Sequence, residues 1–123
     1  MKVKDIIVGK GSHVVSVSQE TTIYKAIEKL AANKVLSLLV LNDDNVIIGI
    51  IGAADILKAV HRACDQIKTG TVKEIMTSKI IVCSPEDDLE DIKNIMTFSR
   101  IRHIPVITGK TLAGIISIGD VVK

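Results

Sequence analysis

Apolar residues recur along this chain with two different spacings, which separate helices from strands. Ile23, Ala26 and Leu30 keep to one face of a helix, and this spacing predicts a helix over about 22–33. The unbroken apolar run over 37–41 predicts a buried strand instead. With turn residues between the apolar runs, the first half is predicted to form strand, helix, strand, strand and helix over residues 14–17, 22–33, 37–41, 46–51 and 53–67.

The second half of the chain repeats the first half. Val3-Lys4-Asp5-Ile6 recurs as Val72-Lys73-Glu74-Ile75, and Gly49-Ile50-Ile51-Gly52 recurs as Gly114-Ile115-Ile116-Ser117. The matched order predicts a strand, a helix and two strands over residues 80–82, 87–98, 103–107 and 111–116, and then a last helix that is short or truncated. Two β-α-β-β-α copies, over 1–68 and 69–123, therefore predict an α/β (α+β) fold packed about a pseudo-twofold axis.

The composition is that of a globular protein with an aliphatic core. Of the 123 residues, 21 are Ile, 14 Val and 8 Leu, against one Tyr, one Phe and no Trp. The scarcity of aromatic rings and the net charge of only +2 argue against nucleic-acid binding. Because the chain has no apolar run of 18 residues and no signal-peptide pattern, we expect a cytoplasmic protein that does not enter the membrane.

Most motifs of enzymes and metal sites are missing from the sequence. Cys64 and Cys83 are predicted to be free, buried thiols, and the three histidines lack the spacing of a zinc site. Gly9-Lys10-Gly11-Ser12 does not have Walker spacing and is predicted to be a surface loop. We therefore predict neither a metal nor an enzyme.

One strand-to-helix junction carries more evident chemistry. Ser117 and Asp120 stand where a predicted strand leads into a helix, so a hydroxyl and a carboxylate could bond the phosphate and the ribose hydroxyls of a nucleotide. The same spacing fits a capping box, with Ser117 at the N-cap and Asp120 reaching back. Ser84-Pro85-Glu86-Asp87 also fits a helix start with Pro at the first position. The pattern leaves both interpretations open.

Two basic residues precede the predicted strand over 103–107. Arg102 and His103 are adjacent, so their side chains point to opposite faces of a strand. One could meet a phosphate while the other is solvated. The alternative is a polar end to a core strand.

These segments together match a known family. The matching residues are Val72-Lys73-Glu74-Ile75-Met76-Thr77, Ser84-Pro85-Glu86, Ile101-Arg102-His103-Ile104-Pro105-Val106 and the run from Gly114 to Val122. The chain resembles a tandem pair of CBS (cystathionine-β-synthase) domains, or Bateman module, and is most similar to small stand-alone two-CBS proteins. The resemblance covers about residues 3–123.

The resemblance implies a regulatory module that binds an adenosyl ligand between its two copies and forms a homodimer. The ligand would be AMP, ADP, ATP, S-adenosylmethionine or NAD, and no cofactor is required. Its site residues, carried over by motif, form two composite clefts. One would use Ser117 and Asp120 with Ser18, Ile23, Ser37 and Leu38, and the other Asp55 with Ser84, Leu89, Arg102 and His103.

The first copy departs from the family pattern. Stand-alone members often have Ser-Glu-Arg-Asp where this chain has Gly52-Ala53-Ala54-Asp55. They also often have Gly where Leu36 stands and Pro where Leu39 stands. The missing hydroxyl and arginine predict a weaker site at Asp55. They also keep open a ligand-free interaction module that serves dimerisation only.

Overall fold

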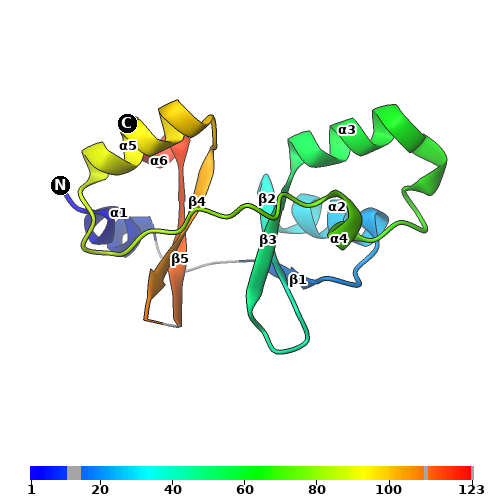
Figure 1. The fold of residues 1–123 in the computed structure, drawn as a ribbon, viewed down its shortest axis with the longest axis horizontal. Coiled ribbons are helices and arrows are strands. Elements are labelled where there is room, and N and C mark those ends of the chain that lie inside the picture. The colour runs from blue at the N-terminus through cyan, green and yellow to red at the C-terminus, as the bar shows by residue number, and fades with distance from the viewer. Residues whose placement is uncertain (11–14, 110, 123) are drawn as a thin grey trace. The chain divides into compact units, whose positions relative to one another are not determined.

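The computed structural model describes residues 1–10, 15–109 and 111–122, and it divides the chain into two compact units (Figure 1). Unit 1 comprises Met1–Val14 and Ile81–Lys123, and unit 2 comprises Val15–Ile80. The predicted repeat boundary at 68/69 therefore does not coincide with the boundaries of the units. In the described part of the chain, no helix is long and apolar enough to span a membrane.

Unit 2 is built around a three-stranded sheet. Its elements are β1 (Ser16–Ser18), α2 (Ile23–Asn33), β2 (Ser37–Leu41), β3 (Ile47–Gly52), α3 (Ala53–Ala63), the 3₁₀ turn η1 (Cys64–Gln66) and α4 (Val72–Ile75). The strand order is β1-β2-β3, with β1 parallel and β3 antiparallel to β2. Leu38, Val40 and Ile51 are fully buried in its core with Ala26 of α2. The predicted strand over 37–41 is confirmed, and the helix over 22–33 begins one residue later than predicted.

The ends of α2 show why it forms where it does. The Thr22 hydroxyl accepts a hydrogen bond from the Lys25 backbone N–H at 3.2 Å, which caps the first turn. Lys34, in the left-handed conformation, ends the helix with its N–H directed at Ala31 and Leu30 carbonyls.

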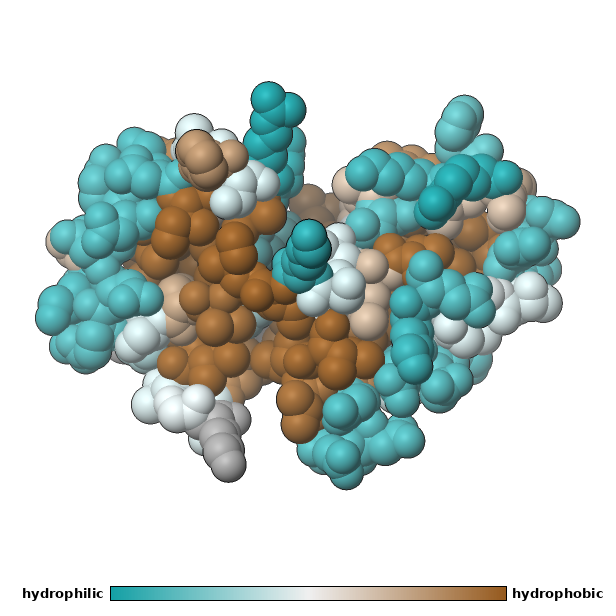
Figure 2. Space-filling view, viewed as in Figure 1, coloured by the Kyte–Doolittle hydropathy of each residue, from teal (hydrophilic) through white to brown (hydrophobic). Residues whose placement is uncertain are grey.

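Unit 1 contains a two-stranded sheet. Its elements are α1 (Val3–Lys10), α5 (Leu89–Ser99), β4 (His103–Thr108), β5 (Thr111–Ser117) and α6 (Ile118–Val121). β4 and β5 are antiparallel, and Ile92 and Met96 of α5 pack on Ile104 and Ile116 in the core. α1 extends to Lys10, so the loop predicted over 9–12 is wrong at 9 and 10, and its other two positions lie outside the described residues. Apolar side chains gather over the strands on the face seen in Figure 2.

The predicted strand over 80–82 is wrong, and the chain's two prolines explain why. In unit 2, the Leu39 N–H donates to the Val15 carbonyl at 3.1 Å and the Gln19 N–H donates to Leu41 at 2.9 Å. Pro105 and Pro85 stand at the positions of Leu39 and Gln19 in the second repeat, and proline has no N–H to donate.

One isolated parallel bridge remains in unit 1. Cys83 pairs with Val106, donating to the Pro105 carbonyl at 3.0 Å and accepting from the Ile107 N–H at 2.8 Å. Ile81, at the position of Val15, is 37% exposed. The two bonds that would extend the bridge into a strand are the ones the prolines remove.

The helix start that the Ser84-Pro85 spacing would fit does not form, and the helix predicted over 87–98 begins two residues later than predicted. α5 begins at Leu89, and its N-cap is Asp88, whose carboxylate accepts from the Glu90 N–H at 2.9 Å. Residues 84–87 instead form a turn closed by the Asp87 N–H and the Ser84 carbonyl at 3.0 Å. A proline fits the second position of such a turn as well as the first turn of a helix.

The short segment at the start of each repeat packs against the first helix of the other repeat. We call residues 3–8 the first lead segment and residues 72–77 the second lead segment. In unit 1, Val3 donates to the Asp87 carbonyl at 3.0 Å, and in unit 2, Val72 donates to Thr21 at 2.8 Å. Both valines are fully buried. Each lead segment therefore docks at the start of the other repeat's first helix, which is why unit boundaries and repeat boundaries differ.

Candidate functional site

The junction of β5 and α6 in unit 1 positions Ser117 and Asp120 as a reciprocal pair. Ser117 donates to Asp120 Oδ2 from both its backbone N–H and its hydroxyl, each at 2.8 Å. The Asp120 N–H returns a bond to the Ser117 hydroxyl at 3.3 Å. The capping box predicted from the spacing is therefore present. Both residues are half-buried, and the role of Asp120 toward a ribose stays a prediction.

The matching junction of β3 and α3 in unit 2 holds Asp55 differently. Asp55 Oδ2 accepts the backbone N–H of Gly52 at 2.9 Å, the equivalent of the Ser117 N–H bond. Gly52 has no hydroxyl, and instead the Thr77 side chain donates to Asp55 Oδ1 at 3.2 Å. Sequence reasoning did not single out Thr77 as a site residue.

The other residues predicted in unit 2 occupy three different environments. Ser37 is half-buried and pairs with Gly52 across β2 and β3, which brings it to the end of the sheet where α3 begins. Leu38 and Ile23 are buried in the core, at 0% and 3% exposure, so their side chains pack on the protein's own apolar groups.

Ser18 is exposed at the opposite end of the sheet. Its hydroxyl lies 3.3 Å from that of Thr21. An open groove of about 640 Å³ passes over both residues and is lined also by Lys25 and Lys29. Lys29 is engaged there, because its ammonium group donates to the Ser16 carbonyl at 2.7 Å.

In unit 1, Arg102 and His103 lie beside the Ser117–Asp120 pair. His103 is the register partner of Ser117 across β4 and β5, and the Arg102 carbonyl accepts the Ile118 N–H at 2.8 Å. Arg102 is exposed and His103 is half-buried. The assignment of these residues to two composite clefts with residues of unit 2 stays a prediction.

Ser84 and Leu89 mark the entry to α5. The Ser84 hydroxyl accepts the Glu86 N–H at 3.2 Å, and its own N–H donates to Asp87 Oδ2 at 2.8 Å. Leu89 is half-buried against the core of unit 1, and its N–H donates to the Met1 carbonyl at 2.9 Å.

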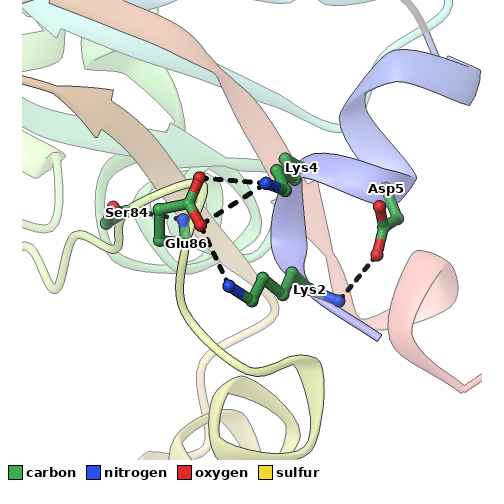
Figure 3. A network of polar contacts seen from close by, with 5 residues as sticks. All are labelled: Lys2, Lys4, Asp5, Ser84 and Glu86. Carbon is green, nitrogen blue, oxygen red and sulfur yellow. Dashed lines mark hydrogen bonds and ion pairs between the residues drawn. The ribbon is translucent and has the colours of Figure 1, made fainter.

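Beside Ser84, one carboxylate joins two lysines of the N-terminal segment (Figure 3). Glu86 accepts from the ammonium group of Lys2 at 3.0 Å and from that of Lys4 at 3.2 Å. Hydrogen bonds and charge from Lys2 and Lys4 lower the pKa of the Glu86 carboxyl. All three side chains are at least half exposed, so the network stabilises unit 1 only weakly.

Both cysteines are free thiols, as predicted, but the predicted burial is wrong for Cys64. Cys64 is exposed and Cys83 is buried. Burial, with a smaller effect of the Asp87 charge, raises the pKa of the Cys83 thiol to about 11. Among the described residues, which exclude His13, no three His, Cys, Asp or Glu side chains are grouped to hold a metal ion.

Comparison with known proteins gives one consistent family. The model described as "CBS domain" matches residues 3–62 and 72–123. The CBS domain-containing protein CBSX3, mitochondrial, of Arabidopsis thaliana is 35% identical over 108 residues, covering 85% of this chain and 52% of that protein. The chain spans about half or less of the length of the first curated relatives that it matches.

Solved structures show the same fold. The CBS-domain containing protein ATU1752 from Agrobacterium tumefaciens superposes with a TM-score of 0.95 at 37% identity, covering 99% of this chain and 97% of that one. The CBS domain pair of protein MJ0100, in complex with 5′-methylthioadenosine and S-adenosylmethionine, superposes with a TM-score of 0.85 at 24% identity, covering 99% and 93%. At that identity the second similarity shows the fold alone.

Proposed function

The chain belongs to the CBS-domain family, and we propose that it is a regulatory module that binds an adenine nucleotide and is not an enzyme. The observation that carries the proposal is an oriented aspartate at the equivalent position of both repeats. In each repeat, an aspartate three residues past a strand end is half-buried, and a strand-end N–H orients its carboxylate. A carboxylate held in this way can accept hydrogen bonds from two neighbouring ribose hydroxyls.

A neighbouring basic side chain in unit 1 could bind the phosphate of the nucleotide. Arg102, which the resemblance assigns to the Asp55 cleft, is exposed in unit 1 beside Ser117, and we propose that its guanidinium binds the phosphate of a nucleotide held by Asp120. The adenosyl compounds bound by MJ0100 have the ribose that we propose Asp120 and Asp55 recognise. A ligand that binds one arrangement of the module about tenfold better than another shifts their equilibrium by about 1.4 kcal/mol, which suffices for a sensor.

We propose in addition that the module is a homodimer. Large apolar side chains are exposed on its helices, among them Leu57 at 70% and Val60 at 39% on α3, and Phe98 at 92% on α5. Leu57 and Val60 are three residues apart and so lie on one face of α3, and an exposed apolar patch on a helix face is typical of a protein interface. The same observation favours the second candidate function, a ligand-free module that only dimerises.

Thermal unfolding with AMP, ADP, ATP, NAD and S-adenosylmethionine at millimolar concentration distinguishes the two functions. A ligand present at a hundred times its Kd stabilises the folded state by about 2.7 kcal/mol, which raises Tm by several degrees. We expect at least one of the five to do so. No shift with any of them would contradict nucleotide binding and leave the dimerisation module.

Asp120→Ala and Asp55→Ala then locate the binding. Each should weaken the affinity for the active ligand by about tenfold or more, measured by calorimetry, because hydrogen bonds to a charged group are lost. Asp43→Ala is the matched control, since Asp43 is an exposed aspartate in the β2–β3 turn. Both site variants also lose a helix cap, which should lower the free energy of unfolding by about 1 kcal/mol. Their Tm without ligand should therefore fall. Unchanged affinity in both would refute the assignment.

A further inference from the structure

Within the described residues, a hydroxyl donates to each of the two aspartates proposed to bind a nucleotide, but the two hydroxyls come from different elements. In unit 1 it belongs to Ser117, the N-cap residue of α6, and lies 2.8 Å from Asp120. In unit 2 the N-cap of α3 is Gly52, and the hydroxyl belongs to Thr77, 22 residues away from Asp55 in sequence.

The sequence shows the same exchange. Gly52 and Ser117 are equivalent in the repeat, and so are Thr77 of the second lead segment and Val8 of the first. The repeat with a serine at the N-cap has valine in the equivalent lead position, and the repeat with glycine at the N-cap has threonine there. One hydroxyl per carboxylate is therefore kept, although its position in the chain changes.

The backbone of Thr77 is fixed in a way that suits a positioning role. Its N–H donates to the Ile50 carbonyl at 2.8 Å, and its carbonyl accepts the Ile50 N–H at 3.0 Å. These two bonds pair Thr77 with Ile50 of β3 as an isolated antiparallel bridge. The Thr77 hydroxyl is thus held against the sheet that also carries Gly52, so both oxygens of Asp55 are bonded to groups fixed on one strand.

We propose that Thr77 is a positioning residue for ribose recognition by Asp55, replacing the serine that the first repeat lacks. The inference rests on the proposed function. Its physical basis is that Gly52 restrains only Oδ2, so a carboxylate without Thr77 can rotate about its side-chain bonds. Binding of a ribose would then have to stop that rotation and lose side-chain entropy. With the Thr77 bond in place, the carboxylate is already fixed before the ribose binds.

The test uses the full chain with Asp120→Ala, so that the site at Asp55 is the one measured. Thr77→Val removes the hydroxyl and keeps the side-chain shape, and Thr77→Ser keeps the hydroxyl. We expect Thr77→Val to weaken AMP binding on the order of tenfold by calorimetry, and Thr77→Ser to bind AMP as the parent does.

A second comparison separates positioning of the carboxylate from a general structural effect. Asp55 is proposed to recognise ribose hydroxyls, so 2′,3′-dideoxy-AMP should bind the parent more weakly than AMP. Thr77→Val should reduce that preference for AMP, and should change the affinity for the dideoxy compound little. A variant that merely loosened unit 2 would lower both affinities by the same factor.

Gly52→Ser supplies the rescue. A Cβ at Gly52 would lie 3.6 Å from the Leu36 carbonyl and 3.9 Å from Asp55 Oδ2, both ordinary contacts, and φ of −118° suits a serine. Adding Gly52→Ser to Thr77→Val should therefore restore most of the AMP affinity, since the hydroxyl returns in the position that Ser117 has in unit 1.

The outcomes distinguish a failure of nucleotide binding at Asp55 from a failure of the positioning role of Thr77. If the Asp120→Ala parent does not bind AMP, nucleotide binding at Asp55 is refuted, and this inference with it. If the parent binds and Thr77→Val binds equally well, Asp55 recognises the ligand without help from Thr77, and only this inference is overturned. Loss of affinity with no rescue by Gly52→Ser also overturns it.

Discussion

The sheets of the two units differ by one strand, although the repeats that form them align almost residue for residue. In unit 2, β1 pairs with β2 over three residues, whereas in the described part of unit 1 the segment equivalent to β1 pairs with β4 at Cys83 alone. The apolar residues of the two segments are similar, and both are followed by the same serine-initiated turn. The difference lies in two backbone N–H groups, at Leu39 and Gln19, which Pro105 and Pro85 lack. Strand formation here depends on donors as much as on apolar pattern.

The largest expected effect comes from giving unit 2 the proline of unit 1. Leu39→Pro should destabilise the fold by about 2–3 kcal/mol, because it removes buried side-chain volume and the bond to the Val15 carbonyl. Leu39→Val is the control, which reduces the volume similarly, keeps the N–H and should cost about 1 kcal/mol. Urea unfolding of both variants measures the difference.

Hydrogen exchange tests the cause of that loss. The amides of β1 should lose protection in Leu39→Pro and keep it in Leu39→Val. Equal stability of the two variants, or unchanged protection of β1, would mean that the proline is not what keeps residues 80–82 from forming a strand.

An intermediate effect comes from two equivalent glycines that the lead segments cover. A Cβ at Gly49 in β3 would collide with the Met76 side chain and lie 3.0 Å from the Thr77 carbonyl, whereas a Cβ at Gly114 in β5 would lie 3.5 Å from the nearest atom of Ile7. Gly49→Ala should therefore destabilise by about 1–2 kcal/mol, and Gly114→Ala by less than about 0.5 kcal/mol. Thermal unfolding measures both. Equal losses would show that the two lead segments pack equally tightly.

The smallest effect concerns the ion pairs of Glu86. In the described part of unit 2, Thr71 replaces Lys2, and no ion pair joins Lys73 and Glu20, the equivalents of Lys4 and Glu86. Lys2 and Lys4 lower the pKa of Glu86 in the folded state, so its contribution to stability is present above the ordinary carboxyl pKa and is lost as the pH falls through the lowered value. Glu86→Gln should lower Tm slightly at pH 7, and this difference should disappear in acid and at high salt.

Glu20→Gln is the control for the charge change, since Glu20 is the equivalent residue in the first repeat. We expect it to leave Tm nearly unchanged across the same pH range. A pH-independent loss in Glu86→Gln would indicate that the side chain acts through packing and not through charge.

Periodicity predicted the interior of each repeat well, because burial dominates there. β2 lies over the predicted residues, and α2 agrees within one residue, since its apolar face and Thr22 cap are both local signals. The strand over 80–82 was predicted wrongly because its apolar residues look like those of a strand. Of its two missing donors, the one at Pro105 lies more than 20 positions away along the chain, and the one at Pro85 lies in the turn that follows. The partner of each lead segment is likewise non-local, so repetition revealed the lead segments but not where they dock.

The candidate site shows the same limit. Spacing alone predicted the Ser117–Asp120 capping box, in which both partners lie within one turn of helix. Leu38 was named for its place in a motif, but it is fully buried in the core, so its side chain faces other apolar groups. Thr77 could have been found from the repeat alignment, by asking which position regains a hydroxyl when Gly52 loses one.

Because each lead segment packs against the other repeat, the two units can complete their folding only in a certain order. Val3 finds its partner at Asp87, 84 residues later, whereas Val72 meets Thr21 with all intervening residues already present. On a ribosome, every residue of unit 2 has been synthesised once Ile80 has emerged, while α1 must wait for the second repeat. Unit 2 is thus an insertion within unit 1, and the late, long-range closure of unit 1 is the step that we expect to limit the folding rate.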